Sequence, residues 1–163
     1  MALVIEKDCS NVDIHDAWEY VSGLTIMNDW SARDLQFQEM AVGLGPSKGK
    51  DFATSIGPYI VSLDEIEDCR DGDRHHLEME ARVNGQQLSR GNLGDLFWTF
   101  PQMIAHASRN TVLRAGDIIG SGTVGTGCIL ELTPENTGGW LMPGDEVELE
   151  VERLGILRNR VAN

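Results

Sequence analysis

This sequence contains few cysteines, and those that it contains are not arranged in pairs. Its 163 residues include Cys9, Cys69 and Cys128, which lie far apart and follow neither a disulfide framework nor a zinc-binding spacing. Reduced thiols in a cytoplasmic protein are the simplest interpretation, because structural disulfides persist mainly in oxidising compartments. The sequence therefore predicts neither a disulfide-stabilised secreted domain nor a cysteine-held zinc site.

Long apolar runs are also missing. No stretch approaches the roughly 20 apolar residues that a membrane-spanning helix requires. The first residues carry neither the basic segment nor the apolar segment of a signal peptide. We therefore expect a cytoplasmic protein that does not associate with a membrane.

Basic residues are scarce, with 13 Lys and Arg against 26 Asp and Glu and a formal net charge of −13. This balance argues against nucleic acid or an anionic membrane as a partner. An acidic substrate would need a local concentration of positive charge, and Arg33 and Lys50 are the candidates for it. The hydrophobic content of 41% and the chain length are typical of one globular domain with its own core.

The segment from Gly23 to Gln36 begins apolar and then turns abruptly polar. Asp29, Arg33 and Gln36 follow one another at i, i+4 and i+7, so a helical turn starting at Ser31 would place Arg33 and Gln36 on one face. A carboxylate, a guanidinium and an amide at such a junction can bind a metal and an anionic substrate together. A plain helix start capped by Ser31 is the simpler explanation of the local pattern.

The end of this segment is the first of four motifs that occur in a fixed order along the chain. They are Asn28-Asp29-Trp30-Ser31-Ala32-Arg33-Asp34-Leu35-Gln36; Gly45-Pro46 with Gly49-Lys50-Asp51-Phe52 and Gly57-Pro58; Gly116-Asp117 with Gly120-Ser121-Gly122-Thr123; and Ile129-Leu130-Glu131-Leu132. Together they resemble the C-terminal catalytic domain of the fumarylacetoacetate hydrolase family. The resemblance implies an α+β fold, a roll of mixed β-sheets with few helices, and a homodimer.

The resemblance also implies a function. The family cleaves carbon–carbon bonds in diketo acids of the fumarylacetoacetate or acylpyruvate type, as in aromatic amino acid catabolism, with a divalent metal. Some members instead isomerise, decarboxylate or hydrate related keto acids. The sequence therefore predicts a metal-dependent hydrolase with a small keto-acid substrate. The alternatives are one of the related reactions or a non-catalytic subunit of the same fold.

Site residues follow from the resemblance position by position. Arg33, Gln36 and Lys50 match groups that bind the substrate and stabilise developing negative charge. Thr123 matches a contact to the substrate carboxylate. Glu131 matches a glutamate that orients a histidine base, which in turn activates water. No histidine of this chain stands in a matching position; the four are His15, His75, His76 and His106.

The predicted metal site is incomplete. Asp29 matches an aspartate ligand of the family, for which Mg²⁺, Ca²⁺ or Mn²⁺ is the expected ion because oxygen donors suit hard cations. By the family's usual spacing, a Glu-x-Glu pair of further ligands would fall immediately before Met1. We therefore expect residues 1–163 to form one N-terminally incomplete catalytic domain with weakened metal binding.

Residue patterns predict the remaining elements. Strands are expected at 2–5, 24–27, 57–63, 77–83, 86–89, 117–119, 129–132, 146–154 and 156–161. Helices are expected at 12–21, capped by Asn11 or Asp13, and at 93–108, capped by Asn92 and kinked or divided at Pro101. Loops are expected at 36–52 and 64–74.

Two groups of ionisable residues are expected to be structural. Glu148, Glu150 and Glu152 alternate with apolar residues and predict an exposed acidic face without basic partners. His75 and His76 are adjacent, so their side chains diverge on a strand and cannot easily share a metal. Both are expected to be structural or surface groups.

Overall fold

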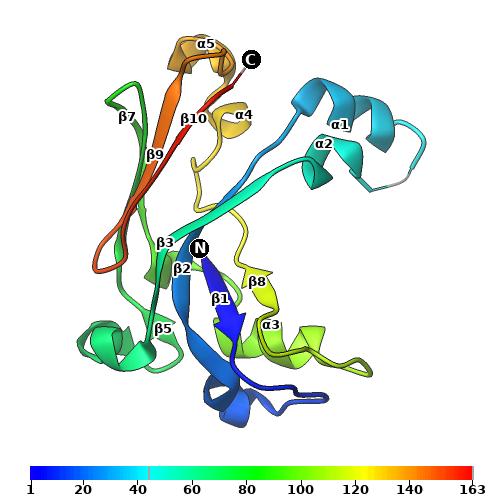
Figure 1. Ribbon diagram of the computed structural model, residues 1–163, viewed down its shortest axis with the longest axis vertical. Helices are drawn as coiled ribbons and strands as arrows, with labels where there is room; N and C mark the ends of the chain where they lie inside the picture. The colour runs from blue at the N-terminus through cyan, green and yellow to red at the C-terminus, as the bar shows by residue number, and fades with distance from the viewer. Residues whose placement is uncertain (44, 163) are drawn as a thin grey trace.

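The computed structural model describes residues 1–43 and 45–162, and these residues adopt the predicted α+β fold, with antiparallel sheets and few helices. Two four-stranded sheets are found among them (Figure 1). The first has the order β3-β2-β1-β8, with β1 (Ala2–Ile5), β2 (Val21–Asp29), β3 (Thr54–Val61) and β8 (Ile118–Gly120). The second has the order β10-β9-β6-β7, with β6 (Glu78–Val83), β7 (Gln86–Asn92), β9 (Glu146–Val151) and β10 (Gly155–Arg160). A short pair joins β4 (Arg70–Asp71) to β5 (Arg74–His75).

Short helices connect these strands. The α-helices are α1 (Arg33–Met40), α2 (Lys48–Asp51), α3 (Phe100–Ala107), α4 (Ile129–Leu132) and α5 (Pro134–Thr137). The 3₁₀ helices are η1 (Ile14–Tyr20), η2 (Leu63–Cys69) and η3 (Leu93–Asp95). In Figure 1 the α1–α2 pair extends from the ends of β2 and β3, away from α3. This projection carries the polar motif of the sequence.

Strand β1 lies in the interior because it has no polar side chain. It pairs with β2 on one side and β8 on the other, and all four of its residues are buried. A continuous apolar run of this kind is typical of a strand covered on both faces. The largest fully buried apolar side chains of the core are Leu3, Ile5, Leu24, Ile26, Ile66, Leu77, Ile104 and Leu154.

Local side-chain contacts explain where the helices begin. Asp13 accepts a hydrogen bond from the His15 amide and caps η1, which confirms one of the two predicted caps. Thr99 and Gln102 form a reciprocal capping box at the start of α3. Pro101 lies in the first turn, where the missing N–H of proline removes no helical hydrogen bond. The predicted helix at 93–108 is therefore divided into η3 and α3, with Asn92 capping only η3.

Both predicted loops were wrong in part. The 36–52 segment contains most of α1 and all of α2, and its residue 44 lies outside the described residues. Helix α1 has no buried residue, so it lacks the apolar periodicity by which a helix is recognised. The 64–74 segment contains most of η2 and strand β4. Here Ile66 is completely buried and anchors an otherwise charged turn to the core.

The second sheet confirms the predicted hairpin and corrects the predicted acidic face. Asn84 and Gly85 both have positive φ, at 52° and 77°, as the tight turn between β6 and β7 requires. Two of the three glutamates predicted to lack basic partners, Glu148 and Glu150, do have them, whereas the Glu152 carboxylate accepts from the Glu78 backbone amide. Arg82 contacts Glu150 at 2.6 Å, and Arg158 contacts Glu148 at 2.5 Å. The sequence pattern missed these pairs because the partners come from different strands.

His75 is buried without a hydrogen-bond partner on either ring nitrogen. Its ring packs edge-on against Trp18, with the centroids 5.2 Å apart. Burial lowers the pKa of the imidazole, and the nearby Arg70 guanidinium adds to the effect while Glu67 opposes it. This confirms a structural role for His75, as a neutral side chain in the core.

We expect acidification to destabilise the protein through His75. The folded pKa lies below the unfolded value of about 6.5, so the unfolded chain binds the proton first as the pH falls. The contribution of neutral His75 is therefore fully present above the unfolded pKa and is lost as pH falls towards the folded pKa. Chemical denaturation from about pH 7 to pH 5 should show a slope of up to about 1.4 kcal/mol per pH unit.

His75→Phe should flatten this slope, because the variant has no group to protonate at that position. His106→Gln, at an exposed position on α3, is the matched control and should retain the slope. Parallel curves for the wild type and His75→Phe would contradict the assignment.

Candidate active site

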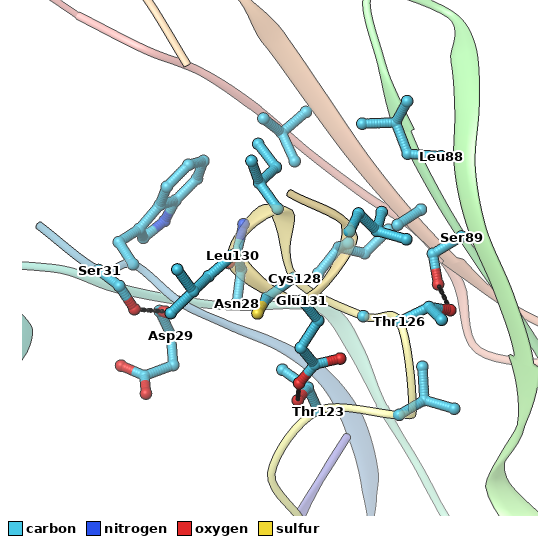
Figure 2. A pocket seen from close by; sticks show the side chains of 18 of the residues that line it. Asn28, Asp29, Ser31, Leu88, Ser89, Thr123, Thr126, Cys128, Leu130 and Glu131 are labelled. Carbon is cyan, nitrogen blue, oxygen red and sulfur yellow. Dashed lines mark hydrogen bonds between the residues drawn. The ribbon is translucent and has the colours of Figure 1, made fainter. Parts of the chain in front are cut away.

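A cavity of about 1310 Å³ lies beside the predicted site residues. The end of β2, helices α1 and α2, strands β6, β7 and β9, and the 120–132 segment contribute to its lining. Figure 2 shows Asp29, Thr123 and Glu131 among the side chains that surround it. Asp29, Arg33, Lys50, Thr123 and Glu131 all line this cavity, although they come from four separate parts of the sequence.

The first wall of the cavity pairs a carboxylate with an ammonium group. Asp29 is the last residue of β2, and the Lys50 Nζ on α2 donates to its Oδ2 at 2.7 Å. The Asp29 side chain is 49% exposed and that of Lys50 25%, so both remain accessible to a ligand. An exposed ion pair of this kind adds little to stability. Both residues line the cavity, so their charged groups face the space that a ligand would occupy.

Arg33 begins α1 beside this pair. Its Nη1 donates to the Gln36 Oε1 at 2.6 Å, which places the two side chains on one helix face as their spacing predicted. Arg33 lines the cavity, whereas Gln36 lies outside its lining. Ser31 is not the helix cap, because the capping position is Ala32 and the Ser31 hydroxyl donates to the Asp29 carbonyl.

The second wall carries Thr123 and Glu131. The predicted strand at 129–132 was wrong, because these residues form the single turn α4. Thr123 precedes α4 in the sequence, and its Oγ1 donates to the Glu131 Oε1 at 3.3 Å. Figure 2 shows this contact. An alternating strand would have sent Glu131 to one face of a sheet, whereas the turn places its carboxylate at the cavity.

Two contacts that the sequence did not reveal fix the second wall to strand β7. A Cβ atom at Gly91 would lie 2.4 Å from the Val124 Cγ2, so a larger residue there would force the Val124 side chain to move. The hydroxyl groups of Ser89 and Thr126 form a hydrogen bond with their oxygens 3.1 Å apart; a dashed line in Figure 2 marks it. Thr126 has a φ of 70°, an unfavourable value for a β-branched residue. No periodic pattern marks such a contact between distant segments.

The four histidines do not take part in this site. None of them is among the described residues that line the cavity. His75 belongs to the core, and His76 contacts Asp71 at 3.8 Å on the surface. The three cysteines are free, and Cys128 lines the cavity.

Asp29, which the motif resemblance predicted as a metal ligand, forms an ion pair with Lys50. Within residues 1–43 and 45–162, no group of three or more His, Cys, Asp or Glu side chains is placed to hold a metal ion. A hard divalent cation takes about six or more oxygen ligands. The described residues on their own therefore supply too few ligands to hold such an ion tightly.

In the described part of the chain, no helix is both long enough and apolar enough to cross a bilayer.

The fold and the cavity define a class of protein, an α+β domain in which basic and acidic side chains from separate elements line one cavity. A family model described as "Fumarylacetoacetate (FAA) hydrolase C-terminal" matches residues 1–162. The chain belongs to this family, as the sequence motifs predicted. Members of the family are enzymes that act on keto acids.

Individual relatives differ in activity. A fumarylacetoacetase from Arabidopsis thaliana is 36% identical over 152 residues, which cover 75% of this chain and 36% of the plant protein. The oxaloacetate tautomerase YisK from Bacillus subtilis is 33% identical over 99% of this chain and 50% of its own length. The chain thus spans half or less of the length of these relatives.

A solved structure of a fumarylpyruvate hydrolase from Pseudomonas aeruginosa, in complex with Mn²⁺ and pyruvate, has the same fold. The TM-score is 0.82, with 25% identity over 99% of this chain and 63% of the other. A divalent metal and a small 2-oxo acid thus occur together in this relative.

Proposed function

We propose that the chain hydrolyses a carbon–carbon bond in a small diketo acid of the fumarylacetoacetate or acylpyruvate type. The observation that supports this proposal is the gathering of Asp29, Arg33, Lys50, Thr123 and Glu131 around one cavity. Two fixed positive charges suit a substrate that carries a carboxylate and becomes more negative as it reacts. A carboxylate on the other wall can accept the proton that hydrolysis releases.

In this mechanism Arg33 and Thr123 bind the substrate carboxylate, and Gln36 holds the Arg33 guanidinium in position. Water adds to the carbonyl group distant from the carboxylate, and Glu131 accepts the proton. Because no histidine lines the cavity in the described residues, we assign this step to Glu131 itself. The bond between the acyl carbon and the methylene carbon then breaks, and its electrons form the enolate of the departing oxo acid, which is a 2-oxo acid when the substrate is an acylpyruvate. Lys50 stabilises that enolate until it takes up a proton.

A second candidate is the tautomerisation of a 2-oxo acid. A single carboxylate suffices to move a proton between carbon and oxygen, so a site in which Glu131 is present and the described lining includes no histidine suits this reaction as well. The tautomerase activity named for the Bacillus relative adds to this support.

Two assays on the full chain, each with Mn²⁺, distinguish the candidates. Hydrolysis predicts release of pyruvate from an acylpyruvate, measured by coupled oxidation of NADH. Tautomerisation predicts faster conversion of enol-oxaloacetate to its keto form, measured by ultraviolet absorbance. Saturable pyruvate binding without either activity would overturn both and support a non-catalytic subunit.

We propose that a divalent cation of the Mg²⁺, Ca²⁺ or Mn²⁺ type binds at Asp29, and that this chain holds it weakly. Asp29 supplies a single carboxylate, and that carboxylate is already paired with Lys50. Water and substrate would have to supply most of the other ligands, so binding should be weak. Calorimetric titration with Mn²⁺ should give a dissociation constant in the range of about 1 mM or weaker. Asp29→Asn should abolish the remaining binding, whereas Asp16→Asn, on the distant η1, should not. Micromolar affinity in the wild type would contradict this expectation.

We also propose a homodimer. Large apolar side chains on β3 are exposed, with Ile56 at 49%, Tyr59 at 67% and Ile60 at 59%. Exposed apolar side chains that lie close together are typical of association surfaces. Analytical ultracentrifugation should therefore show a dimer, and Tyr59→Asp should shift the population towards monomer while Val42→Asp, on the α1–α2 connection, should not. A wild-type monomer at all concentrations would overturn the proposal.

A further inference from the structure

We propose that Glu39 is a positioning residue that fixes helix α2 and thereby holds Lys50 against Asp29 in the cavity. The inference rests on the proposed function to the extent that Lys50 acts on the substrate. Glu39 lies on α1 and does not line the cavity, so it is not a catalytic residue itself.

The Glu39 carboxylate accepts three backbone hydrogen bonds at the start of α2. Its Oε2 accepts from the Ser47 amide at 2.8 Å and the Gly49 amide at 3.2 Å, and its Oε1 accepts from the Lys48 amide at 2.8 Å. The first amides of a helix have no partner within the helix, so an acceptor from outside determines whether that turn is ordered. A charged acceptor makes these bonds stronger than neutral ones.

A second set of contacts fixes α2 along α1. The Ala32 amide donates to the Gly49 carbonyl at 2.9 Å. A Cβ atom at Gly49 would lie 2.9 Å from the Gln36 backbone nitrogen, so the two helices touch at a point that only glycine permits. Helix α2 is therefore held at both ends of α1, by Ala32 at its start and by Glu39 near its end.

This arrangement sets the position of Lys50. A helix of four residues is too short to be stable by itself, because helix nucleation is unfavourable. Lys50 follows the anchored Gly49 directly, and its Nζ reaches the Asp29 Oδ2 at 2.7 Å. Since the lysine stem is flexible, the location of its backbone decides whether the ammonium group remains in the cavity.

The three amides also lower the pKa of Glu39, and the Ser47 amide contributes most. Because the folded pKa lies below the unfolded value, the contribution of the ionised carboxylate is present above the unfolded pKa. It is lost only as the pH falls through the folded pKa. The anchor therefore remains intact at neutral pH, where the following measurements are made.

The test compares Glu39→Ala and Glu39→Gln with the wild type in measurements that need no turnover. Amide hydrogen exchange at Ser47, Lys48 and Gly49 should become about tenfold faster or more in Glu39→Ala, as expected when charge-assisted hydrogen bonds are lost. The Lys50 amine should react several-fold faster with acetic anhydride, whereas the distant Lys7 should not change. Glu39→Gln, which keeps the shape and one acceptor oxygen, should lie between the wild type and Glu39→Ala. Glu135→Gln removes one exposed carboxylate on α5 and is the matched control.

Each outcome decides a separate point. Unchanged amide exchange in Glu39→Ala, with the fold retained by circular dichroism, would overturn the anchor. Faster exchange with unchanged Lys50 acetylation would overturn the link to Lys50. Amide exchange and Lys50 acetylation can be measured whether or not the chain acts on keto acids. Absence of keto-acid activity would therefore overturn the proposed function but not the positioning role of Glu39.

With an active substrate, a double-mutant cycle adds a kinetic readout. Glu39→Ala should lower kcat more than it raises KM, and it should have no further effect in a Lys50→Met background. Independent effects of the two substitutions would overturn the positioning role.

Discussion

Replacing Lys50 with methionine should lower kcat by about 10²–10³-fold, the typical effect of removing one group that stabilises a developing oxyanion. Methionine matches the unbranched apolar stem of lysine as far as Cε but lacks the charged ammonium group. Asp29 would then lose its partner at 2.7 Å, and the enolate would lose the ammonium group that faces it. Steady-state kinetics on an acylpyruvate, with pyruvate release as the signal, measure the effect.

Lys48→Met is the matched control for this prediction. It removes the same charge from the same four-residue helix, but the Lys48 side chain does not line the cavity and the backbone amide that contacts Glu39 is retained. We expect its kcat to stay close to that of the wild type. Equal losses in the two variants would show that net charge, rather than a specific contact, is responsible.

Glu131→Gln should lower kcat by about 10²–10⁴-fold, the range for loss of a general base. Glutamine retains the shape of the side chain and can still accept from Thr123, so the fold of α4 should not change. It cannot accept the proton of the attacking water. Single-turnover kinetics should therefore show slower chemistry, while pyruvate binding measured by calorimetry stays close to that of the wild type.

Glu135→Gln, on the neighbouring α5 and outside the cavity lining, controls for the loss of a negative charge. A fully active Glu131→Gln variant would exclude Glu131 as the proton acceptor. It would direct attention to a bound water or to a group outside the described residues.

The sequence predicted the strands more reliably than the short helices. Strand β1 and the β6–β7 hairpin were recognisable because their signals are local, a continuous apolar run in one and an Asn-Gly turn in the other. The start of helix α1 was anticipated, but its continuation beyond Gln36 was predicted to be a loop, and α4 was predicted to be a strand. The first buries none of its side chains and the second is a single turn, so neither displays the periodicity by which helices are recognised.

The candidate site was predicted by motif resemblance rather than by spacing. Asp29 and Lys50 are separated by 21 positions, and Thr123 belongs to another part of the chain. Tertiary contacts that leave no regular signature in the sequence supplied the rest, including the Glu39 anchor, the close approach of Gly91 to Val124 and the Ser89–Thr126 pair. The partners of Glu148 and Glu150 were missed for the same reason.

The sequence alone determined the family, the α+β class, the acidic charge and the residue types available for chemistry, because these depend on composition, local pattern and motif order. Only the tertiary structure decided that Asp29 meets Lys50 and that Glu131 reaches the cavity from a helical turn. The physical reason is that a site depends on distances between side chains from separate elements. Those distances are set by how strands and helices pack, and no short window of sequence encodes them.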